Sequence, residues 1–153
     1  MPIKIVDGNL LDATETYLCH QCNCMSQRSA HLAASVFARF PYANVYAGRE
    51  VPDFPGSITV CGDGKDERFV VCMFGQLYPG CKYPDGWKDG RAKRVQFFID
   101  CLIELADLEG TFAMPWKIGC GAAGGDWEND YLPILEEWAE DNNKELTLYR
   151  LEV

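Results

Sequence analysis

Apolar positions along the chain follow two periods, and the alternation between them predicts an α/β protein. Short apolar runs typical of strands occupy residues 3–6, 17–24, 57–61, 68–74, 111–116 and 146–153. Three other segments repeat apolar residues at helical spacing, namely residues 29–40, residues 89–109 and the stretch after Asp126. Because strands alternate with helices, the pattern predicts a mixed sheet with helices packed on both faces.

Turn and capping residues mark the ends of these elements. Ser29 can cap the first helix, Pro41 ends it and Gly110 closes the second. Residues 62–65 predict a turn that brings one strand back as a hairpin. Residues 75–88 predict a long surface loop, a kind of segment that is often functional.

Composition limits the classes of partner. The 153 residues fit a single domain, and 48% are apolar, which suffices for a core without disulfides or a structural metal. A net charge of −9 would repel nucleic acids and anionic membranes. No run approaches the roughly 18 apolar residues of a membrane span, and the amino-terminal residues lack the pattern of a secretory signal. We therefore expect a cytoplasmic protein without nucleic-acid or membrane partners.

Cysteines are frequent but do not by themselves predict a metal site. Residues 19–24 contain three cysteines and His20, a combination that zinc can use. A second ligand pair at finger-like spacing is missing, and most cysteines lie in apolar runs, as small buried hydrophobic residues do. The sequence therefore predicts no metal and a reducing compartment.

A glycine-rich segment, residues 117–126, is the strongest local signal of function. It lies between a predicted strand and a predicted helix, so its N–H groups can face an anion while the helix dipole adds attraction. Gly119, Gly121 and Gly124 match G-x-G-x-x-G, although a dinucleotide-binding segment would follow the first strand. Two interpretations remain open, a phosphate-binding loop or a tight turn that packs the helix on the sheet. Asp126 has the spacing of an N-cap.

Polar residues interrupt the second predicted strand at His20 and Asn23. Buried polar groups need partners, so these two side chains either bond to a neighbouring loop or face a ligand. His31 lies at the start of the first long helix, where a surface position is the default. The patterns of serine hydrolases, metalloproteases and P-loops are absent.

Basic residues form one main cluster, at the start of the second helix. This cluster consists of Lys88, Arg91, Lys93 and Arg94. We interpret it as a solvated helix start rather than a nucleic-acid footprint.

Five segments, taken in order, make the chain resemble the macro domain family. These segments are Gly8-Asn9-Leu10, His20-Gln21-Cys22-Asn23-Cys24, Phe40-Pro41-Tyr42-Ala43, Pro55-Gly56-Ser57-Ile58 and Pro115-Trp116-Lys117-Ile118-Gly119-Cys120-Gly121-Ala122-Ala123-Gly124-Gly125-Asp126-Trp127. The likeness covers nearly the whole chain, residues 1–153. It is closest to the small stand-alone members that process ADP-ribose derivatives, the ADP-ribose-1''-phosphate phosphatases and the hydrolases that remove ADP-ribose from proteins.

The resemblance implies a single macro-like domain whose cleft at the strand ends binds ADP-ribose. Asn9 would contact the adenine edge, with Leu10 beside it, and Asn23 would face the distal ribose. The phosphate-binding loop would consist of Gly119, Cys120, Gly121, Ala122, Ala123, Gly124 and Gly125.

Two departures from the family bear on activity. Residues 26–33 contain no glycine where many members carry a glycine-rich loop against the distal ribose. Residues 75–78 lack the lysine that some glycohydrolase branches use. Both departures favour a module that binds without catalysis. Among hydrolytic reactions, the missing lysine and the likeness to the phosphatase branch around His20 and Asn23 place the phosphatase reaction ahead of removal of ADP-ribose from proteins.

Three side chains are candidates for catalysis of that hydrolysis. His20 and His31 are candidates for proton transfer, and Asp126 is a candidate for orienting a water molecule. The alternatives are a non-catalytic module that recognises ADP-ribosylated protein, and a structural or partner-binding domain with a vestigial cleft.

Overall fold

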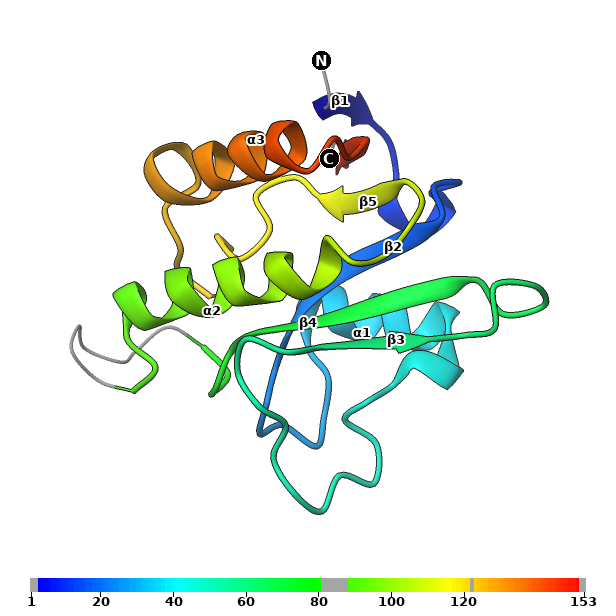
Figure 1. The fold of residues 1–153 in the computed structure, drawn as a ribbon. Coiled ribbons are helices and arrows are strands. Elements are labelled where there is room, and N and C mark those ends of the chain that lie inside the picture. Colours follow the sequence, from blue (N-terminus) through cyan, green and yellow to red (C-terminus); the bar gives the residue numbers. More distant parts are fainter. Residues whose placement is uncertain (1–2, 81–87, 122, 152–153) are drawn as a thin grey trace.

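A computed structural model describes residues 3–80, 88–121 and 123–151 and contains one six-stranded sheet (Figure 1). The strand order is β1-β6-β5-β2-β4-β3. The strands are β1 (Ile3–Asp7), β2 (Tyr17–Asn23), β3 (Ile58–Cys61), β4 (Phe69–Gln76), β5 (Phe112–Pro115) and β6 (Leu146–Arg150). Neighbours pair in parallel, except that β3 runs antiparallel to β4 as the predicted hairpin.

Helices cover both faces of the sheet. The three helices are α1 (His31–Arg39), α2 (Arg91–Leu105) and α3 (Leu132–Asp141). On one face, α2 and α3 pack against the sheet through residues such as Phe98 and Trp138, and on the other, α1 packs through Val36 and Phe37 (Figure 1). The predicted α/β class, a mixed sheet between helices, is confirmed.

Strand β2 is the centre of the molecule because it pairs with β4 on one side and with β5 on the other. Cys19 belongs to the core under α2 and α3, whereas Leu18 and Cys22 belong to the core under α1. The helix after β2 and the helix after β5 lie on opposite faces, so the chain leaves these neighbouring strands in opposite directions. A crevice at the carboxyl ends of the strands follows from that divergence.

Helix ends differ from the sequence prediction in two places. The N-cap of α1 is Ala30, without a side-chain bond, so the prediction that Ser29 caps this helix is wrong. A π-helical turn, Trp127–Tyr131, precedes α3, and the Asp126 side chain accepts a hydrogen bond from the Asn129 N–H at its start. The N-cap interpretation of Asp126 is confirmed. No helix in the described part of the chain is long and apolar enough to cross a membrane.

Candidate functional site

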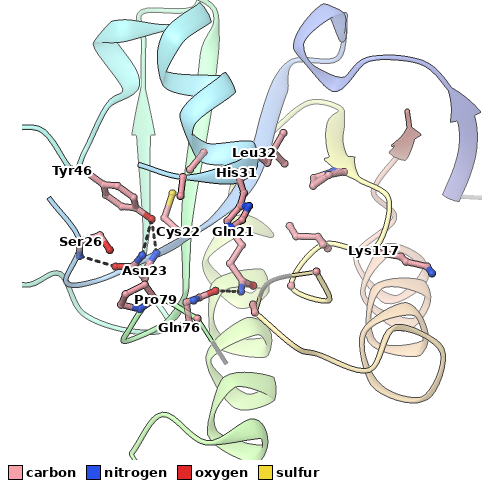
Figure 2. A pocket seen from close by; sticks show the side chains of 18 of the residues that line it. Gln21, Cys22, Asn23, Ser26, His31, Leu32, Tyr46, Gln76, Pro79 and Lys117 are labelled. Atoms are coloured by element: carbon pink, nitrogen blue, oxygen red, sulfur yellow. Dashed lines mark hydrogen bonds between the residues drawn. The ribbon is translucent and has the colours of Figure 1, made fainter. Parts of the chain in front are cut away.

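A cavity of about 390 Å³ lies at the carboxyl ends of β2, β4 and β5 (Figure 2). This volume is within the range of pockets that bind small molecules. Its walls come from the end of β2 and the loop that follows, the start of α1, Tyr46 in the segment after α1, the end of β4 with the residues that follow, and the loop after β5. The lining residues are Gln21, Cys22, Asn23, Ser26, Arg28, Ala30, His31, Leu32, Ala33, Tyr46, Gln76, Pro79, Gly80, Pro115, Trp116, Lys117, Ile118, Gly119, Gly121 and Ala123.

The charge of this cavity differs from that of the whole chain. The chain carries 23 acidic residues and a net charge of −9, yet none of the described lining residues is acidic. Arg28 and Lys117 bring positive charge to the lining, and the N-terminus of the nine-residue helix α1 reaches it at His31. A helix N-terminus adds partial positive charge. The cavity is therefore suited to an anion.

Asn23 organises the wall that follows β2. Its Oδ1 accepts hydrogen bonds from the N–H groups of Met25, at 3.0 Å, and Ser26, at 2.7 Å, and its Nδ2 donates to the Tyr46 hydroxyl at 3.2 Å (Figure 2). Of the two roles open for Asn23, the structure therefore shows the bond to a neighbouring loop. The same residue lines the cavity, so the turn it holds forms part of the wall.

A buried arginine braces this first wall from behind. Arg49 Nη1 donates to the carbonyl oxygens of Asn23, at 3.2 Å, and Ser26, at 3.0 Å, and Nη2 pairs with Asp53 at 2.8 Å. Gln27 Nε2 donates to the Arg49 carbonyl at 2.9 Å. Sequence reasoning missed Arg49 because it lies in an irregular segment that no periodic pattern covers.

The second wall is the glycine-rich segment after β5. Its backbone bonds to itself: the N–H groups of Cys120, Gly124 and Gly125 donate to the carbonyl oxygens of Lys117, Gly121 and Gly119 at 2.9, 3.0 and 3.0 Å. Those three N–H groups are therefore engaged within the loop. Gly119, Gly121 and Ala123 reach the lining, while Ala122 lies outside the described residues.

Gly119 must be glycine, whereas Gly121 is free to change. Gly119 has a φ of +77°, and a Cβ on it would come within 2.7 Å of the Tyr131 ring. A Cβ on Gly121 would meet nothing within 4 Å. The structure therefore shows the tight packing that the sequence left open, with Gly119 against Tyr131, and it places Gly121 at the cavity, where phosphate binding stays a prediction.

A second buried arginine holds this wall to the rest of the site. Arg94, on α2, pairs with Asp89 at 2.7 Å, and both side chains are at most 5% exposed. Its Nη1 also donates to the carbonyl oxygens of Gly80, at 2.6 Å, and Ala123, at 3.0 Å. The prediction that this basic cluster is solvated is therefore wrong for Arg94.

Solved structures resemble this architecture closely. No protein-family model and no curated protein matches the sequence. The macrodomain of Mycobacterium tuberculosis DarG aligns with a TM-score of 0.71 and 19% identity over 96% of each chain. The macrodomain of Thermus aquaticus DarG aligns with a TM-score of 0.64 and 20% identity over 99% of this chain and 98% of the other.

The chain has the macrodomain fold. Thermosipho africanus DarTG, solved in complex with ADP-ribose, also aligns, with a TM-score of 0.64 and 14% identity over 97% of this chain and 41% of that one. The predicted macro-like fold is confirmed. At this level of sequence identity, the similarity to these structures shows the fold of the chain.

Within this macrodomain fold, part of the predicted site comes together at the cavity. Of the predicted site residues, the lining contains Asn23, His31, Gly119, Gly121 and Ala123. Gly124 and Gly125 instead border a neighbouring cavity of about 50 Å³ beside Arg94. Cys120 is half-buried, and its thiol has a pKa raised to about 12. Burial is the largest cause, and the negative charges of Asp126 and Asp130 add to it. It is therefore a neutral thiol near neutral pH rather than a thiolate nucleophile.

His20 does not reach this site. Its side chain is 0% exposed, lies edge-on to the Phe37 ring at 5.4 Å, and points into the core under α1. The sequence made it a candidate for proton transfer, but a sealed imidazole outside the lining cannot exchange a proton with a ligand in the cavity.

Asp126 lies outside the lining too. Its carboxylate accepts bonds from the Asn129 side chain, at 2.9 Å, and backbone, and pairs with Arg91 at 3.1 Å. These bonds lower the pKa of Asp126, and the hydrogen bonds from Asn129 have the largest effect. The geometry gives it a capping role instead of contact with a bound water in the main cavity.

Asn9 and Leu10 are also absent from the described lining of the main cavity. Asn9 Oδ1 accepts the Leu11 N–H at 3.0 Å and caps the short 3-10 helix Leu10–Asp12. Leu10 is 4% exposed and belongs to the core under α1. The structure thus shows local structural roles for both residues.

Gln21 is a lining residue to which sequence reasoning assigned no role. Its Nε2 donates to Gln76 Oε1 at 2.7 Å, and Gln76 Nε2 donates to the Tyr78 carbonyl at 2.9 Å (Figure 2). Gln21 Oε1 is buried and has no hydrogen-bond partner within the described structure. An unpaired buried acceptor at a cavity is suited to a ligand hydroxyl, because leaving it unpaired is costly. Only its polarity within an apolar strand could have pointed to it.

Proposed function

We propose that this protein binds ADP-ribose or an ADP-ribose derivative in the main cavity and hydrolyses it. The observation that carries the proposal is a cavity lining without described acidic residues in a chain of net charge −9. A cavity without described carboxylates in an otherwise acidic chain favours an anionic ligand, because a carboxylate in the lining would repel a phosphate. The macrodomain fold and the complex of Thermosipho africanus DarTG with ADP-ribose support the choice of that anion.

The cavity offers a partner for each part of such a ligand. The diphosphate would lie between the second wall, with the N–H groups of Gly119 and Gly121, and the N-terminus of α1. Arg28 and Lys117 would add charge. A ribose hydroxyl would donate to Gln21 Oε1, and apolar lining residues such as Leu32 would contact the purine ring.

Calorimetric titration tests the binding step. We expect a one-to-one complex with ADP-ribose and weaker binding of ribose 5-phosphate, which lacks the diphosphate and the base. Absence of heat with millimolar ADP-ribose, from protein shown to be folded by circular dichroism, would contradict the proposal.

His31 is the candidate for proton transfer, because it alone among the predicted catalytic residues lines the cavity. Imidazole can donate and accept protons near neutral pH. With ADP-ribose-1''-phosphate, a water oxygen would bond to phosphorus while the bond from phosphorus to the C1'' oxygen breaks. His31 would give a proton to that oxygen, and the attacking water would release one that restores the proton on His31, yielding ADP-ribose and inorganic phosphate.

Turnover measurements test the chemistry and the role of His31. Release of phosphate from ADP-ribose-1''-phosphate is measured beside release of ADP-ribose from a modified protein. We expect the first reaction to be faster. His31→Ala should lower its rate about 100-fold with ADP-ribose affinity nearly unchanged, whereas Glu136→Gln, on the exposed side of α3, should change neither.

A second candidate function is a non-catalytic reader of ADP-ribosylated protein. It is favoured by the same lining, because a cavity without described carboxylates offers few groups that could act as a general base. Tight binding of ADP-ribose together with no turnover of either substrate would select the reader.

A further inference from the structure

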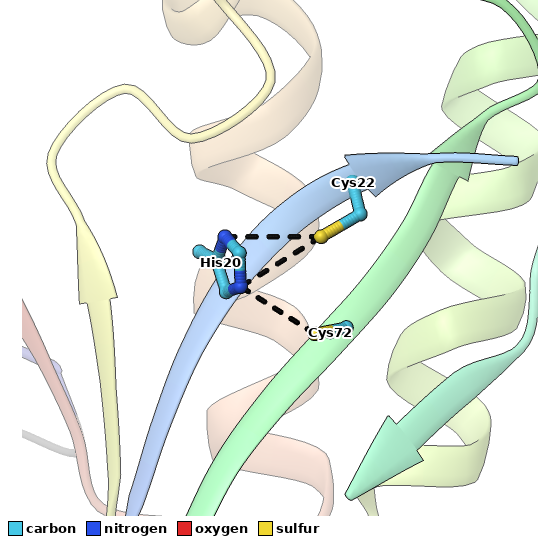
Figure 3. A group of neighbouring side chains, drawn as sticks. All are labelled: His20, Cys22 and Cys72. Atoms are coloured by element: carbon cyan, nitrogen blue, oxygen red, sulfur yellow. Dashed lines mark hydrogen bonds between the residues drawn. The ribbon is translucent and has the colours of Figure 1, made fainter. Parts of the chain in front are cut away.

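Three potential metal ligands meet in the core under α1, beneath the floor of the main cavity, which only Cys22 of the three also lines (Figure 3). His20 and Cys22 lie two residues apart on β2, so their side chains share one face of the sheet. Cys72, on β4, pairs directly with His20 in the strand register. Their ligand atoms lie within 4.8 Å of one another, and all three residues are buried. The sequence alone could not predict this group, because Cys72 is remote along the chain.

The distances between these atoms match the edges of a zinc tetrahedron. With bonds of about 2.3 Å to sulfur and about 2.0 Å to nitrogen, ligand atoms around Zn²⁺ lie about 3.5 to 3.8 Å apart. His20 Nε2 lies 3.7 Å from Cys22 Sγ and 3.5 Å from Cys72 Sγ. His20 Nδ1 lies 3.8 Å from the same Cys22 Sγ, so both ring nitrogens face that sulfur, and the ring would rotate to direct the Nε2 lone pair at a shared ion.

Cys61 lies next to this group, but its Sγ is not within 4.8 Å of all three ligand atoms, so its side chain would have to turn toward the ion to become a fourth ligand. It lies on β3 opposite Val70, and Cys72 is two residues further along β4 on the same face. Its thiol interacts with that of Cys72, and this contact, together with burial, raises the pKa of Cys61. Cys61 is only partly buried. It therefore connects the sealed group to the surface and provides an entry path.

We propose that His20, Cys22 and Cys72 bind a Zn²⁺ ion in this core, with Cys61 as the fourth ligand. Three thiolates around one Zn²⁺ give the site a net charge of 2 − 3 = −1, and the partly buried position of Cys61 brings that charge close to solvent. On binding, the thiols of Cys22, Cys72 and Cys61 lose their protons to water and form three Zn–S bonds, and a lone pair of His20 Nε2 forms the fourth.

Such an ion would join three neighbouring strands beneath α1. It would link β2 to β4 and β4 to β3, directly under Phe37. Because α1 contributes the N-terminus that lines the main cavity, and Cys22 lines it too, the ion would stabilise that part of the cavity from beneath. We assign it a structural role that is independent of the proposed ADP-ribose chemistry.

Metal content provides the primary test. The full chain is refolded from denaturant under reducing conditions with excess ZnCl₂, freed of unbound metal by gel filtration and analysed by mass spectrometry. We expect about one zinc ion per chain. Cys22→Ala and Cys72→Ala should lose it, whereas Cys19→Ala should retain it. Cys19 is the matched control, since it is an equally buried thiol on β2 that belongs to the opposite core.

Spectroscopy on the unaltered chain keeps the proposal testable if the variants fail to fold. Refolding with Co²⁺ should give the intense near-ultraviolet band of thiolate-to-cobalt charge transfer, which one equivalent of Zn²⁺ should remove. Cys61→Ala should weaken Zn²⁺ binding at least about tenfold, and an unchanged affinity would overturn its assignment as a ligand. Less than about a tenth of an ion per chain, with no cobalt band, would overturn the site.

Discussion

The two walls of the main cavity are both braced by a buried arginine, but they are built in opposite ways. The second wall, after β5, bonds through its own backbone at glycines and is fixed from outside by Arg94. The first wall, after β2, has no glycine between residues 23 and 30 and is held by the side chains of Asn23 and Arg49. One wall thus leaves N–H groups for a ligand, and the other presents side chains.

The burial of the two ion pairs differs as well. Asp89, the partner of Arg94, is 0% exposed at its side chain, whereas Asp53, the partner of Arg49, is 38% exposed. A carboxylate left unpaired in the core has no water to replace its partner, but one near the surface does. The comparison therefore predicts that the second wall depends more strongly on its arginine than the first.

Arg94→Met should have the largest effect on stability. It leaves Asp89 charged and buried and removes the bonds to the carbonyl oxygens of Gly80 and Ala123. We expect the free energy of unfolding to fall by about 3–5 kcal/mol, measured by urea denaturation. Arg91→Met, at an exposed position on the same helix, should cost under about 1 kcal/mol. Equal losses in the two variants would remove the special role of Arg94.

Arg49→Met should destabilise the chain less. Asp53 can turn to water, so we expect a loss of about 1–3 kcal/mol. Arg39→Met removes an exposed pair with Asp12 and serves as the control. A loss for Arg49→Met as large as that for Arg94→Met would contradict the ranking of the walls.

Gly121→Val should separate binding from stability. Because a Cβ at this position meets nothing within 4 Å, the thermal midpoint should hardly change. The added side chain would occupy the space beside the second wall, so ADP-ribose affinity should fall at least about tenfold. Gly119→Val, which collides with Tyr131, should instead destabilise the fold. Unchanged calorimetric affinity of folded Gly121→Val would exclude this wall as the phosphate site.

Arg28→Gln should give the smallest effect, because its side chain is exposed and its charge is screened. We expect ADP-ribose to bind about threefold to tenfold more weakly at low salt, with the difference shrinking as salt rises. Arg39→Gln, at the far end of α1, is the matched control. Equal effects of the two substitutions would point to general charge rather than to the first wall.

The fold was predictable from sequence because its signals are local. Residues on β4 form a nearly continuous apolar run, as a strand buried on both faces does, β2 is apolar apart from its interrupting polar residues, and α1 and α2 carry helical periodicity. The glycine segment was recognisable for the same reason. The N-cap role of Asp126 was predictable too, because it depends only on a hydrogen bond within its own turn.

The remaining features depend on contacts between distant segments. In the sequence, Arg94 resembles an ordinary surface arginine. The carbonyl oxygens that it binds come from residues 78, 80 and 123, and the sequence does not show that these residues lie close to it. His20 resembles a catalytic residue until the register with Cys72 places it in the core. Asn9 and Leu10 follow the family motif, yet their local cap and core contacts are visible only in three dimensions.

Amide NMR titration with ADP-ribose tests the central claim most directly, because it reports on both walls at once. We predict saturable shifts at Gly119, Gly121 and Ala123 and at the first residues of α1. The amides around a separate cavity of about 220 Å³, beside Thr14 and Glu145, should stay unchanged. Shifts confined to that second cavity, or no saturable shift at all from the folded protein, would contradict the account.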